Sequence, residues 1–249
     1  PLGLLAPQAS RDDSARSRLV RAGVRQTLLL CHELLQHGQD WAQTGVLELR
    51  QDGQPALPDV WPAQGAAWSE DRGTALWHAA GGWIKPARLV QRCLESSNVE
   101  FVGSSAVSSI TRQSDQWVLR DDRGRLLAQA SQVVIAAAGN SVQLLEKLAQ
   151  SQPPSAPLAL RLAPMSALAG QVTWALQEAG DEVLLAACRA HPYPVNGHGS
   201  FVSQVPMHGA QAWFAGATYE PDPAAPADVA ASHRDNLARL SHLLPQTAN

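Results

Sequence analysis

The sequence predicts a mixed fold of the α/β (α+β) class, in which helices and strands both contribute. Three observations support this class. A helical apolar stripe covers residues 12–37, short alternating segments separated by turn residues fill 106–130, and a β-branched run at 133–135 leads into small residues at 136–139. The first pattern repeats about every 3.6 residues and the second about every two, while the third is typical of a buried strand that enters a tight turn.

We expect the first helix to begin near Asp12 and Asp13, which can cap its N–H groups, and to end near His37, before Gly38. Three arginines form a stripe beside its apolar side. This stripe has two interpretations, a solvated helix face or a contact surface for the phosphates of a cofactor or RNA. The arginines are Arg18, Arg21 and Arg25.

The next part of the chain alternates between short elements and irregular sequence. Gly45 to Arg50 reads as a strand, and residues 51–80 are rich in Pro, Gly, Gln and Ala and look irregular. Pro86 suits the first turn of a helix because its missing N–H has no partner there. Residues 99–102 then read as a strand.

An antiparallel meander is expected next, and a second half rich in strands follows it. The meander strands are Ala106–Thr111, Gln116–Arg120 and Leu126–Ala130, with a turn at 121–124. After them come a buried strand at Gln132–Ala137, a helix at Ser141–Gln150 and a Pro/Ser linker to Pro157. Further strands are expected near 158–162, 170–175, 182–188, 200–205 and 212–218, with a final helix at Ala227–Leu244.

Bulk composition limits the function classes. The 249 residues are 45% hydrophobic and carry a net charge of −3, which gives no overall attraction to nucleic acid or acidic membranes. Three distant cysteines and no C-x-x-C pair favour a reduced, cytoplasmic compartment, and no apolar run is long enough to span a membrane. The start without Met and the end just beyond a helix indicate a piece of a longer protein.

Several motifs are excluded. His32 and His37 are five residues apart, so they diverge around a helix by about 140° and cannot share a metal easily. Gly197-His198-Gly199 lacks the third glycine of a dinucleotide fingerprint and is better read as a turn between strands. We find no P-loop and no G-x-S-x-G elbow, and we expect no metal site.

Four residues are candidates for a ligand pocket. Trp83 follows two glycines and could form a wall over a planar ligand, although tryptophan more often packs in a core. His198 could be a loop histidine near substrate. Tyr219 and Glu220 follow a strand that could end at a pocket, although Glu220 could equally be a solvated acid.

The chain resembles one family in several motifs that occur in the same order. Gly81–Leu89 is similar to a G-G-W-x-x-P-x-x-L segment, Val133–Gly139 to a V-V-x-A-x-G strand, Gly170–Val172 to a G-Q-V strand and Gly216–Tyr219 to a G-A-[ST]-[YF] strand. The family is the FAD-dependent domain of the bifunctional tRNA 5-methylaminomethyl-2-thiouridine biosynthesis proteins (MnmC type). The wider resemblance is to the D-amino-acid-oxidase superfamily.

This resemblance implies FAD as cofactor, a partial Rossmann-like FAD-binding domain with an inserted meander, and a mixed-sheet substrate domain. It implies a bordering segment at 1–80, part of the FAD domain at 81–150 and the substrate domain at 151–249. It also implies cofactor contacts at Val107, Ala136, Ala137 and Gly139. The family's G-x-G-x-x-G segment and its C-terminal glycine-rich segment are absent from this chain, and His198 stands where a tyrosine is expected.

The reaction implied by the resemblance is oxidative removal of the carboxymethyl group from carboxymethylaminomethyl-(2-thio)uridine at the tRNA wobble position. A methyltransferase domain fused upstream is part of the same expectation. Two alternatives stay open. A glycine- or sarcosine-type oxidase would need an arginine deep in its pocket for the carboxylate, such as Arg189 or Arg161. A non-catalytic substrate-binding fragment would not retain flavin.

Overall fold

The structure is a computed structural model. It describes residues 2–8, 12–50, 57, 69–95, 98–151, 168–178, 180–219 and 228–245. These residues form two compact units. The first holds the described residues up to Val99 and from Ala169 onward, and the second holds Glu100 to Ser151 together with Leu168.

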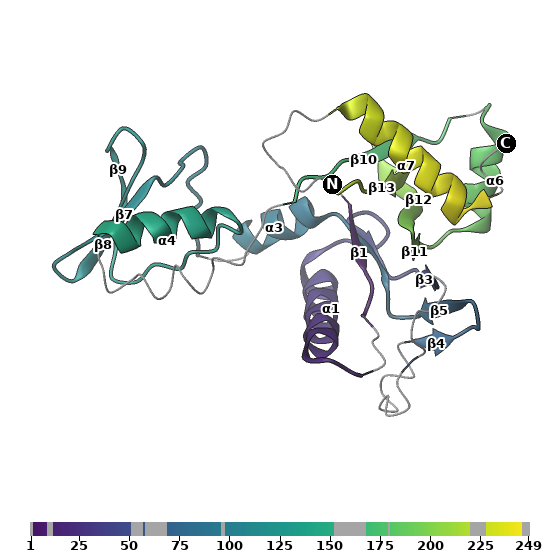
Figure 1. The fold of residues 1–249 in the computed structure, drawn as a ribbon, viewed down its shortest axis with the longest axis horizontal. Coiled ribbons are helices and arrows are strands. Elements are labelled where there is room, and N and C mark those ends of the chain that lie inside the picture. The colour runs from purple at the N-terminus through teal and green to yellow at the C-terminus, as the bar shows by residue number, and fades with distance from the viewer. Residues whose placement is uncertain are drawn as a thin grey trace. The chain divides into compact units, whose positions relative to one another are not determined.

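The first unit is built on a seven-stranded sheet (Figure 1). All neighbouring strands are antiparallel except β11 and β3, which are parallel. In spatial order the strands are β10 (Val172–Leu176), β13 (Ala210–Gly216), β12 (Gly199–Met207), β11 (Val195–Gly197), β3 (Val46–Leu49), β5 (Ala75–His78) and β4 (Glu70–Asp71).

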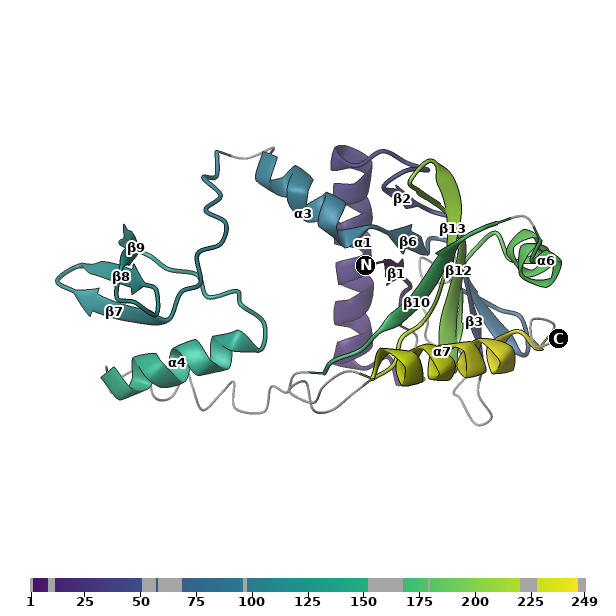
Figure 2. The ribbon, with the colours of Figure 1, turned by 90° about the horizontal axis from the view of Figure 1, so that it is seen from above.

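A small antiparallel sheet and four helices complete this unit. The small sheet has the order β1 (Gly3–Leu5), β6 (Gly82–Ile84) and β2 (Trp41–Ala42). The helices are α1 (Ala15–Leu34), α3 (Pro86–Glu95), α6 (Glu182–Ala190) and α7 (Val229–Leu243). Figure 2 shows α7 lying along one face of β10, β13 and β12.

Strand alternation gives the large sheet two different cores. Phe201 and Trp213 pack with Leu240 of α7, whereas their neighbours Val202 and Phe214 pack with Trp83 of the small sheet. Successive side chains on a strand point to opposite faces, so each strand serves both cores. The face opposite α7 is therefore covered in part by the small sheet.

Helix α1 packs on the small sheet through Val24, Leu28 and Cys31. Its N-cap is Ser14, whose hydroxyl accepts the N–H of Ser17 at 3.3 Å, and not Asp12 or Asp13. A serine oxygen at this position satisfies a helix N–H as well as a carboxylate does. The helix also ends at Leu34, before His37, because Leu35 turns to an extended backbone.

The second unit contains a meander and a helix. Strands β7 (Ser109–Gln113), β8 (Gln116–Arg120) and β9 (Leu126–Ala130) pair antiparallel in that order, and α4 (Asn140–Ser151) packs on β7. The bounds predicted for β8 and β9 are confirmed. The predicted first strand begins three residues early, because Ala106 to Ser108 lie outside the ladder.

Two predicted strands are wrong, one that precedes the meander and one that follows it. Residues 99–102 and 132–137 are not strands, and Val134 is 89% exposed. The β-branched side chains favour a strand, but a strand also needs a paired neighbour, and within the described residues none pairs with either segment.

The predicted strand at 182–188 is also wrong, since it is helix α6. Asp181 caps this helix by accepting the N–H of Leu184 at 3.0 Å, and the leucines and alanines that follow favour a helix. Residues 51–80 were expected to be irregular, but this segment contains β4 and β5. Strand β5 pairs with β3, and β4 pairs with β5. The strand expected near 158–162 lies outside the described residues.

Substitution of Gly82 tests the close contact between β6 and β2. A Cβ at this position would lie 1.9 Å from the carbonyl oxygen of Ala42, so we expect Gly82→Ala to lower the free energy of unfolding by about 1–3 kcal/mol or more. Gly23 in α1 is the control, because a Cβ there meets nothing within 4 Å. Gly23→Ala is expected to raise stability by about 0.5–1 kcal/mol. Urea unfolding measures both, and equal stability of the two variants would contradict the contact.

Candidate functional site

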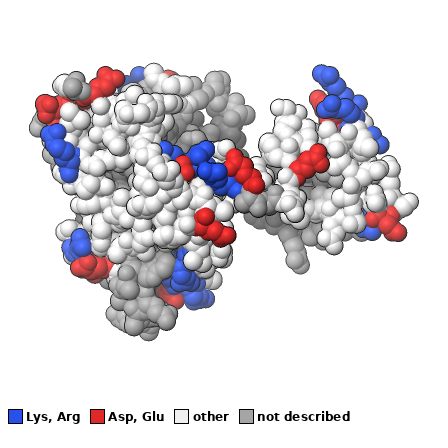
Figure 3. All heavy atoms as spheres, turned by 180° about the vertical axis from the view of Figure 1, so that it is seen from behind, with Lys and Arg blue, Asp and Glu red and all other residues white. Residues whose placement is uncertain are grey.

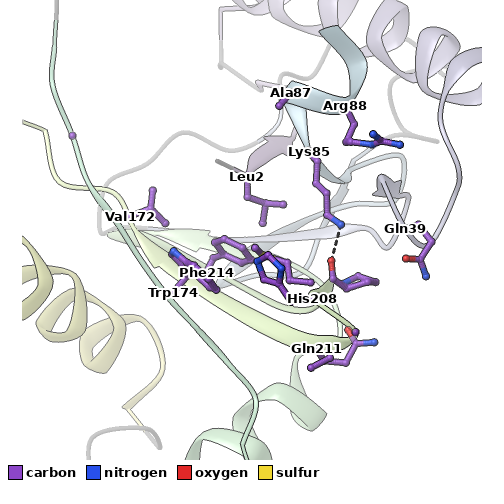
Figure 4. Close-up of a pocket in the computed structure, with 15 residues that line it drawn as sticks. Leu2, Gln39, Lys85, Ala87, Arg88, Val172, Trp174, His208, Gln211 and Phe214 are labelled. Carbon is purple, nitrogen blue, oxygen red and sulfur yellow. Dashed lines mark hydrogen bonds between the residues drawn. The ribbon is translucent and has the colours of Figure 1, made fainter. Parts of the chain in front are cut away.

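A cavity of about 990 Å³ in the first unit lies against the sheet face opposite α7. We call it the Trp174 cavity. Val172 and Trp174 of β10 and Phe214 of β13 form one wall, and Leu2 lies above them (Figure 4). Lys85 and other residues at the start of α3 form part of the opposite side.

Trp174 is the main aromatic group of this cavity. Its ring is stacked on Phe214 with a centroid distance of 6.0 Å and an angle of 20°, and His208 lies 6.5 Å away at 33°. Trp174 pairs with Phe214 across the β10–β13 ladder, so the backbone register fixes this arrangement. The wall is therefore a preformed aromatic surface.

Two cations line the same cavity. Lys85 Nζ donates to the carbonyl oxygen of Pro206 at 2.6 Å, and burial lowers the pKa of this ammonium below its ordinary value. Arg88 Nε donates to Asp40 at 2.9 Å, and this partner helps to lower the pKa of the Asp40 carboxyl against the opposing effect of burial. The three groups together leave one net positive charge at this side of the cavity.

A second cavity of about 390 Å³ adjoins the first, because Leu2, Val172 and Phe214 line both. We call it the His198 cavity. Gly197 and Gly199 pair with each other, so His198 occupies a tight turn between β11 and β12, as the sequence predicts. This turn brings His198 to the cavity.

Arg239 reaches the His198 cavity from α7. Its side chain packs beside Gly199, where a Cβ would lie 3.3 Å from Arg239 Cβ, and its guanidinium donates to the carbonyl oxygen of Ala217 at 3.4 Å. Arg239 is half-buried, and within the described residues no carboxylate forms an ion pair with it. Such a cation can bind an anionic group of a ligand.

The structure brings together two of the four pocket candidates. His198 and Tyr219 both line the His198 cavity, and Tyr219 is 70% exposed. Trp83 is only 3% exposed and packs in the core with Val202 and Phe214, so it borders neither cavity. Glu220 lies outside the described residues.

The residues expected to contact the cofactor lie in the second unit. Ala136 and Ala137 are exposed, and Val107 and Gly139 are half-buried. Ala137 donates its N–H to Ser141 Oγ at 3.1 Å, and α4 begins directly after this bend. An open bend of small residues before a helix N-terminus fits the close approach of a nucleotide, so these residues are compatible with FAD.

The two sequence neighbours of Val107 line a separate hollow of about 450 Å³ in the second unit. Ala106 and Ser108 line it, together with residues of the turn at 121–125. Most of the residues that line the hollow are polar, among them three serines, Asp121 and Arg125. It is a further surface of the second unit on which part of a nucleotide could lie.

The arginines of the predicted stripe differ in exposure: Arg18 and Arg25 are exposed, whereas the Arg21 side chain is only 12% exposed. Arg18 and Arg21 both bond to Asp13, which favours the interpretation of their stripe as a helix face with local ion pairs. Arg189 is 65% exposed and pairs with Glu182 at 3.6 Å. It borders no described cavity, and Arg161 lies outside the described residues.

Three polar side chains form a hydrogen-bonded group at the β3–β5–β4 edge of the large sheet. His78 donates or accepts at both ring nitrogens, 2.7 Å from Ser69 Oγ and 3.0 Å from Glu48 Oε2. The three residue types match those of a nucleophilic triad. His78 is fully buried and Ser69 is 3% exposed, and neither borders a described cavity, so the group stabilises the pairing of β3, β4 and β5.

Other reactive groups give no second site in the described part of the chain. No set of three metal-ligand side chains gathers there, and none of its helices is long and apolar enough to cross a membrane. Burial raises the pKa of Cys31 and Cys188 to about 11, so both remain thiols at neutral pH.

Sequence reasoning missed Trp174, Lys85 and Arg239 as cavity residues. The signal for Trp174 was present, because it follows the G-Q-V segment on an alternating strand. Arg239 carried no signal, since it is one of several charged residues in the last helix. Only the packing of α7 against β11 and β12 brings it to the turn at His198.

The family described as FAD dependent oxidoreductase matches residues 2–249. The chain is similar to the tRNA 5-methylaminomethyl-2-thiouridine biosynthesis bifunctional proteins MnmC of Albidiferax ferrireducens and Polaromonas sp. strain JS666. The identities are 39% over 252 residues and 41% over 268 residues, which cover 99% and 100% of this chain. The chain spans 38% and 40% of the lengths of these relatives.

Among solved structures the chain is similar to glycine oxidase from Geobacillus kaustophilus, with a TM-score of 0.63 and 16% identity. It is similar to the same degree to iminodiacetate oxidase from Chelativorans sp. BNC1. The alignments cover 99% of this chain and 67% and 69% of those chains. At these identities the similarity concerns the fold alone, and it confirms the predicted mixed class.

His191, the C-cap of α6, provides a test of how burial affects a titratable group in the first unit. Burial lowers the pKa of its imidazole below 6.5, so in the window just below pH 6.5 the unfolded chain binds a proton that the folded chain does not. Stability therefore falls as the pH falls through this window. We expect His191→Gln to flatten this part of the pH profile, measured by urea unfolding. An unchanged slope would contradict the burial of this ring in the folded protein.

Proposed function

The chain belongs to the family of FAD-dependent oxidoreductases, and we propose that it supplies the substrate-binding part of an enzyme that oxidises a secondary amine on a tRNA base. The substrate is carboxymethylaminomethyl-(2-thio)uridine at the wobble position, and the reaction removes the carboxymethyl group. The curated relatives support this proposal, because their names describe biosynthesis of a methylaminomethyl-thiouridine in tRNA. A methyltransferase fused upstream stays a prediction.

The observation that carries the proposal is the pair of adjoining cavities. The Trp174 cavity, at about 990 Å³, is far larger than glycine or sarcosine needs and suits a group of nucleoside size. The His198 cavity beside it has a cation, Arg239, for a carboxylate. A substrate with a planar base and a short acidic arm matches this combination of shape and charge.

The proposed reaction is a two-electron oxidation of the substrate that is followed by hydrolysis. FAD, when bound, accepts two electrons from the substrate. The carbon between the amine nitrogen and the carboxylate gives up one hydrogen together with its electron pair, which is the two-electron equivalent that FAD would accept. The nitrogen loses its proton, and a C=N double bond joins the two atoms. Water then adds to the imine carbon and the C–N bond breaks, which gives glyoxylate and the aminomethyl nucleoside.

The residues of this chain hold the substrate in that reaction. Arg239 would bind the carboxylate, and this ion pair would fix the reacting carbon in one place. His198 and Tyr219 line the same cavity and would form its polar wall. The amine must be neutral when it loses a hydride equivalent, and no strong base is required for the C–H bond to break.

A free glycine- or sarcosine-type substrate is the competing function. Its small size leaves most of the Trp174 cavity empty, and Arg189, named from the sequence for its carboxylate, is at the surface. A non-catalytic role is the other alternative, and it would leave the purified full-length protein without flavin absorbance.

The first test is turnover by the full-length protein with its FAD. With tRNA that carries carboxymethylaminomethyluridine, we expect formation of glyoxylate and of the aminomethyl nucleoside in equal amounts, measured by hydrazone trapping and nucleoside mass spectrometry. Unmodified tRNA is the control and should yield neither. Turnover of glycine or sarcosine with none of the modified tRNA would refute the proposed substrate.

The second test concerns the carboxylate contact. We expect Arg239→Met to raise the KM for the modified tRNA by about 10- to 100-fold, because a charge-assisted bond is lost. Arg189→Met is the matched control, since this arginine is 65% exposed and borders no described cavity. Equal KM values for Arg239→Met and the unaltered protein would show that Arg239 does not bind the substrate carboxylate.

A further inference from the structure

We propose that the Trp174 cavity binds one nucleobase of the tRNA anticodon loop, unstacked from its neighbours and laid against the Trp174 ring. This inference rests on the proposed function, because tRNA is the macromolecule invoked there. It identifies the occupant of the Trp174 cavity as a planar aromatic base that carries a phosphate.

The aromatic wall is the first reason for this occupant. Trp174 is 47% exposed, although Thr173 beside it is buried. Phe214 is only 8% exposed and supports the indole ring by stacking on it. A rigid, half-exposed indole at the wall of a cavity offers a flat surface that a base can cover, and bases stack on such side chains in RNA-binding proteins.

The remaining lining suits the edges of a base. Gln39, in the turn before β2, and Gln211 of β13 border the cavity, and His208 lies beside the aromatic wall (Figure 4). Amide groups both donate and accept hydrogen bonds, so they can pair with the polar edge of a base.

The charges next to the wall suit a phosphate. Lys85 donates one of its three N–H groups to Pro206, so the others can reach a phosphate oxygen, and Arg88 is 40% exposed. Asp40 balances one of these two charges. On the face shown in Figure 3, charged side chains form small groups of mixed sign and no broad basic surface. Contact with RNA on this face would therefore be local, as a stacked base with one phosphate is.

The isoalloxazine ring of FAD is also planar and is the main rival occupant of the same wall. The two occupants predict different results. Loss of the Trp174 ring would lower FAD content in the rival case, whereas it would lower RNA affinity at constant FAD content in the proposed one. FAD content is therefore measured on every variant.

The test measures binding of an unmodified anticodon stem-loop RNA to the full-length, FAD-loaded protein. This probe carries no carboxymethyl group, so its affinity does not depend on whether the proposed reaction occurs. We expect Trp174→Ala to weaken binding by about 5- to 100-fold and Trp174→Phe to restore most of the affinity, because the ring is what the base contacts. FAD content should be unchanged. Trp117→Ala is the control, since Trp117 borders no described cavity.

The phosphate contact gives an independent measurement. We expect Lys85→Gln to reduce the slope of log affinity against log salt concentration by about 0.7, the value for one phosphate of a single strand. Arg112→Gln removes the same charge from the second unit and should leave the slope unchanged.

Three results would overturn the proposal. Trp174→Ala could bind the stem-loop as tightly as the unaltered protein, or it could lose FAD in proportion to RNA affinity. If this variant fails to fold, photo-crosslinking of the unaltered protein to a stem-loop with 4-thiouridine at the wobble position decides. Crosslinks within 172–176 or 206–214 support the proposal, and crosslinks only to other peptides refute it. If the protein binds the stem-loop but does not turn over the modified tRNA, the proposed reaction is refuted, whereas base binding in the Trp174 cavity is still supported.

Discussion

The antiparallel ladder of β10, β13 and β12 is the constraint on which the rest of the first unit depends. Its register places Trp174 opposite Phe214 and Phe201 opposite Ala215. Because side chains alternate between faces, Phe201 and Trp213 are directed to the core under α7, and Phe214 is directed to the other face. A shift of one residue would exchange the two faces and remove the aromatic wall. The same pairing that stabilises the sheet therefore creates the cavity.

Helix α7 covers one face of the large sheet and also contributes Arg239 to the His198 cavity. Leu240 and Leu243 of α7 are buried in the core of the sheet, and this packing fixes where the helix passes the turn between β11 and β12. Arg239 is adjacent to Leu240 in the sequence, and its side chain lies beside Gly199 at that turn. A cation is thereby held at the end of the sheet by apolar contacts that have no part in ligand binding.

The sequence allowed prediction of those elements whose patterns are local. The alternating residues of β8 and β9 and the glycines around His198 depend on neighbours in the chain, and each of these predictions was confirmed. The run at 133–135 could not be interpreted locally, because a buried strand needs partners and no described strand pairs with it. Helix α6 was misread because a run of leucine, valine and alanine is apolar in either conformation, and only the cap at Asp181 distinguishes them. Trp174 and Arg239 come from segments more than sixty residues apart, and their joint position follows from tertiary packing alone.

In the proposed complex the two adjoining cavities hold a modified base, with its ring at Trp174 and its acidic arm at Arg239. The most direct measurement is an experimental structure of the full-length, FAD-loaded protein bound to an anticodon stem-loop with carboxymethylaminomethyluridine at the wobble position. The account predicts an anticodon-loop base stacked on Trp174 and a carboxylate oxygen within hydrogen-bond distance of the Arg239 guanidinium. Density for the flavin ring on Trp174, or for the carboxylate on another cation, would contradict it.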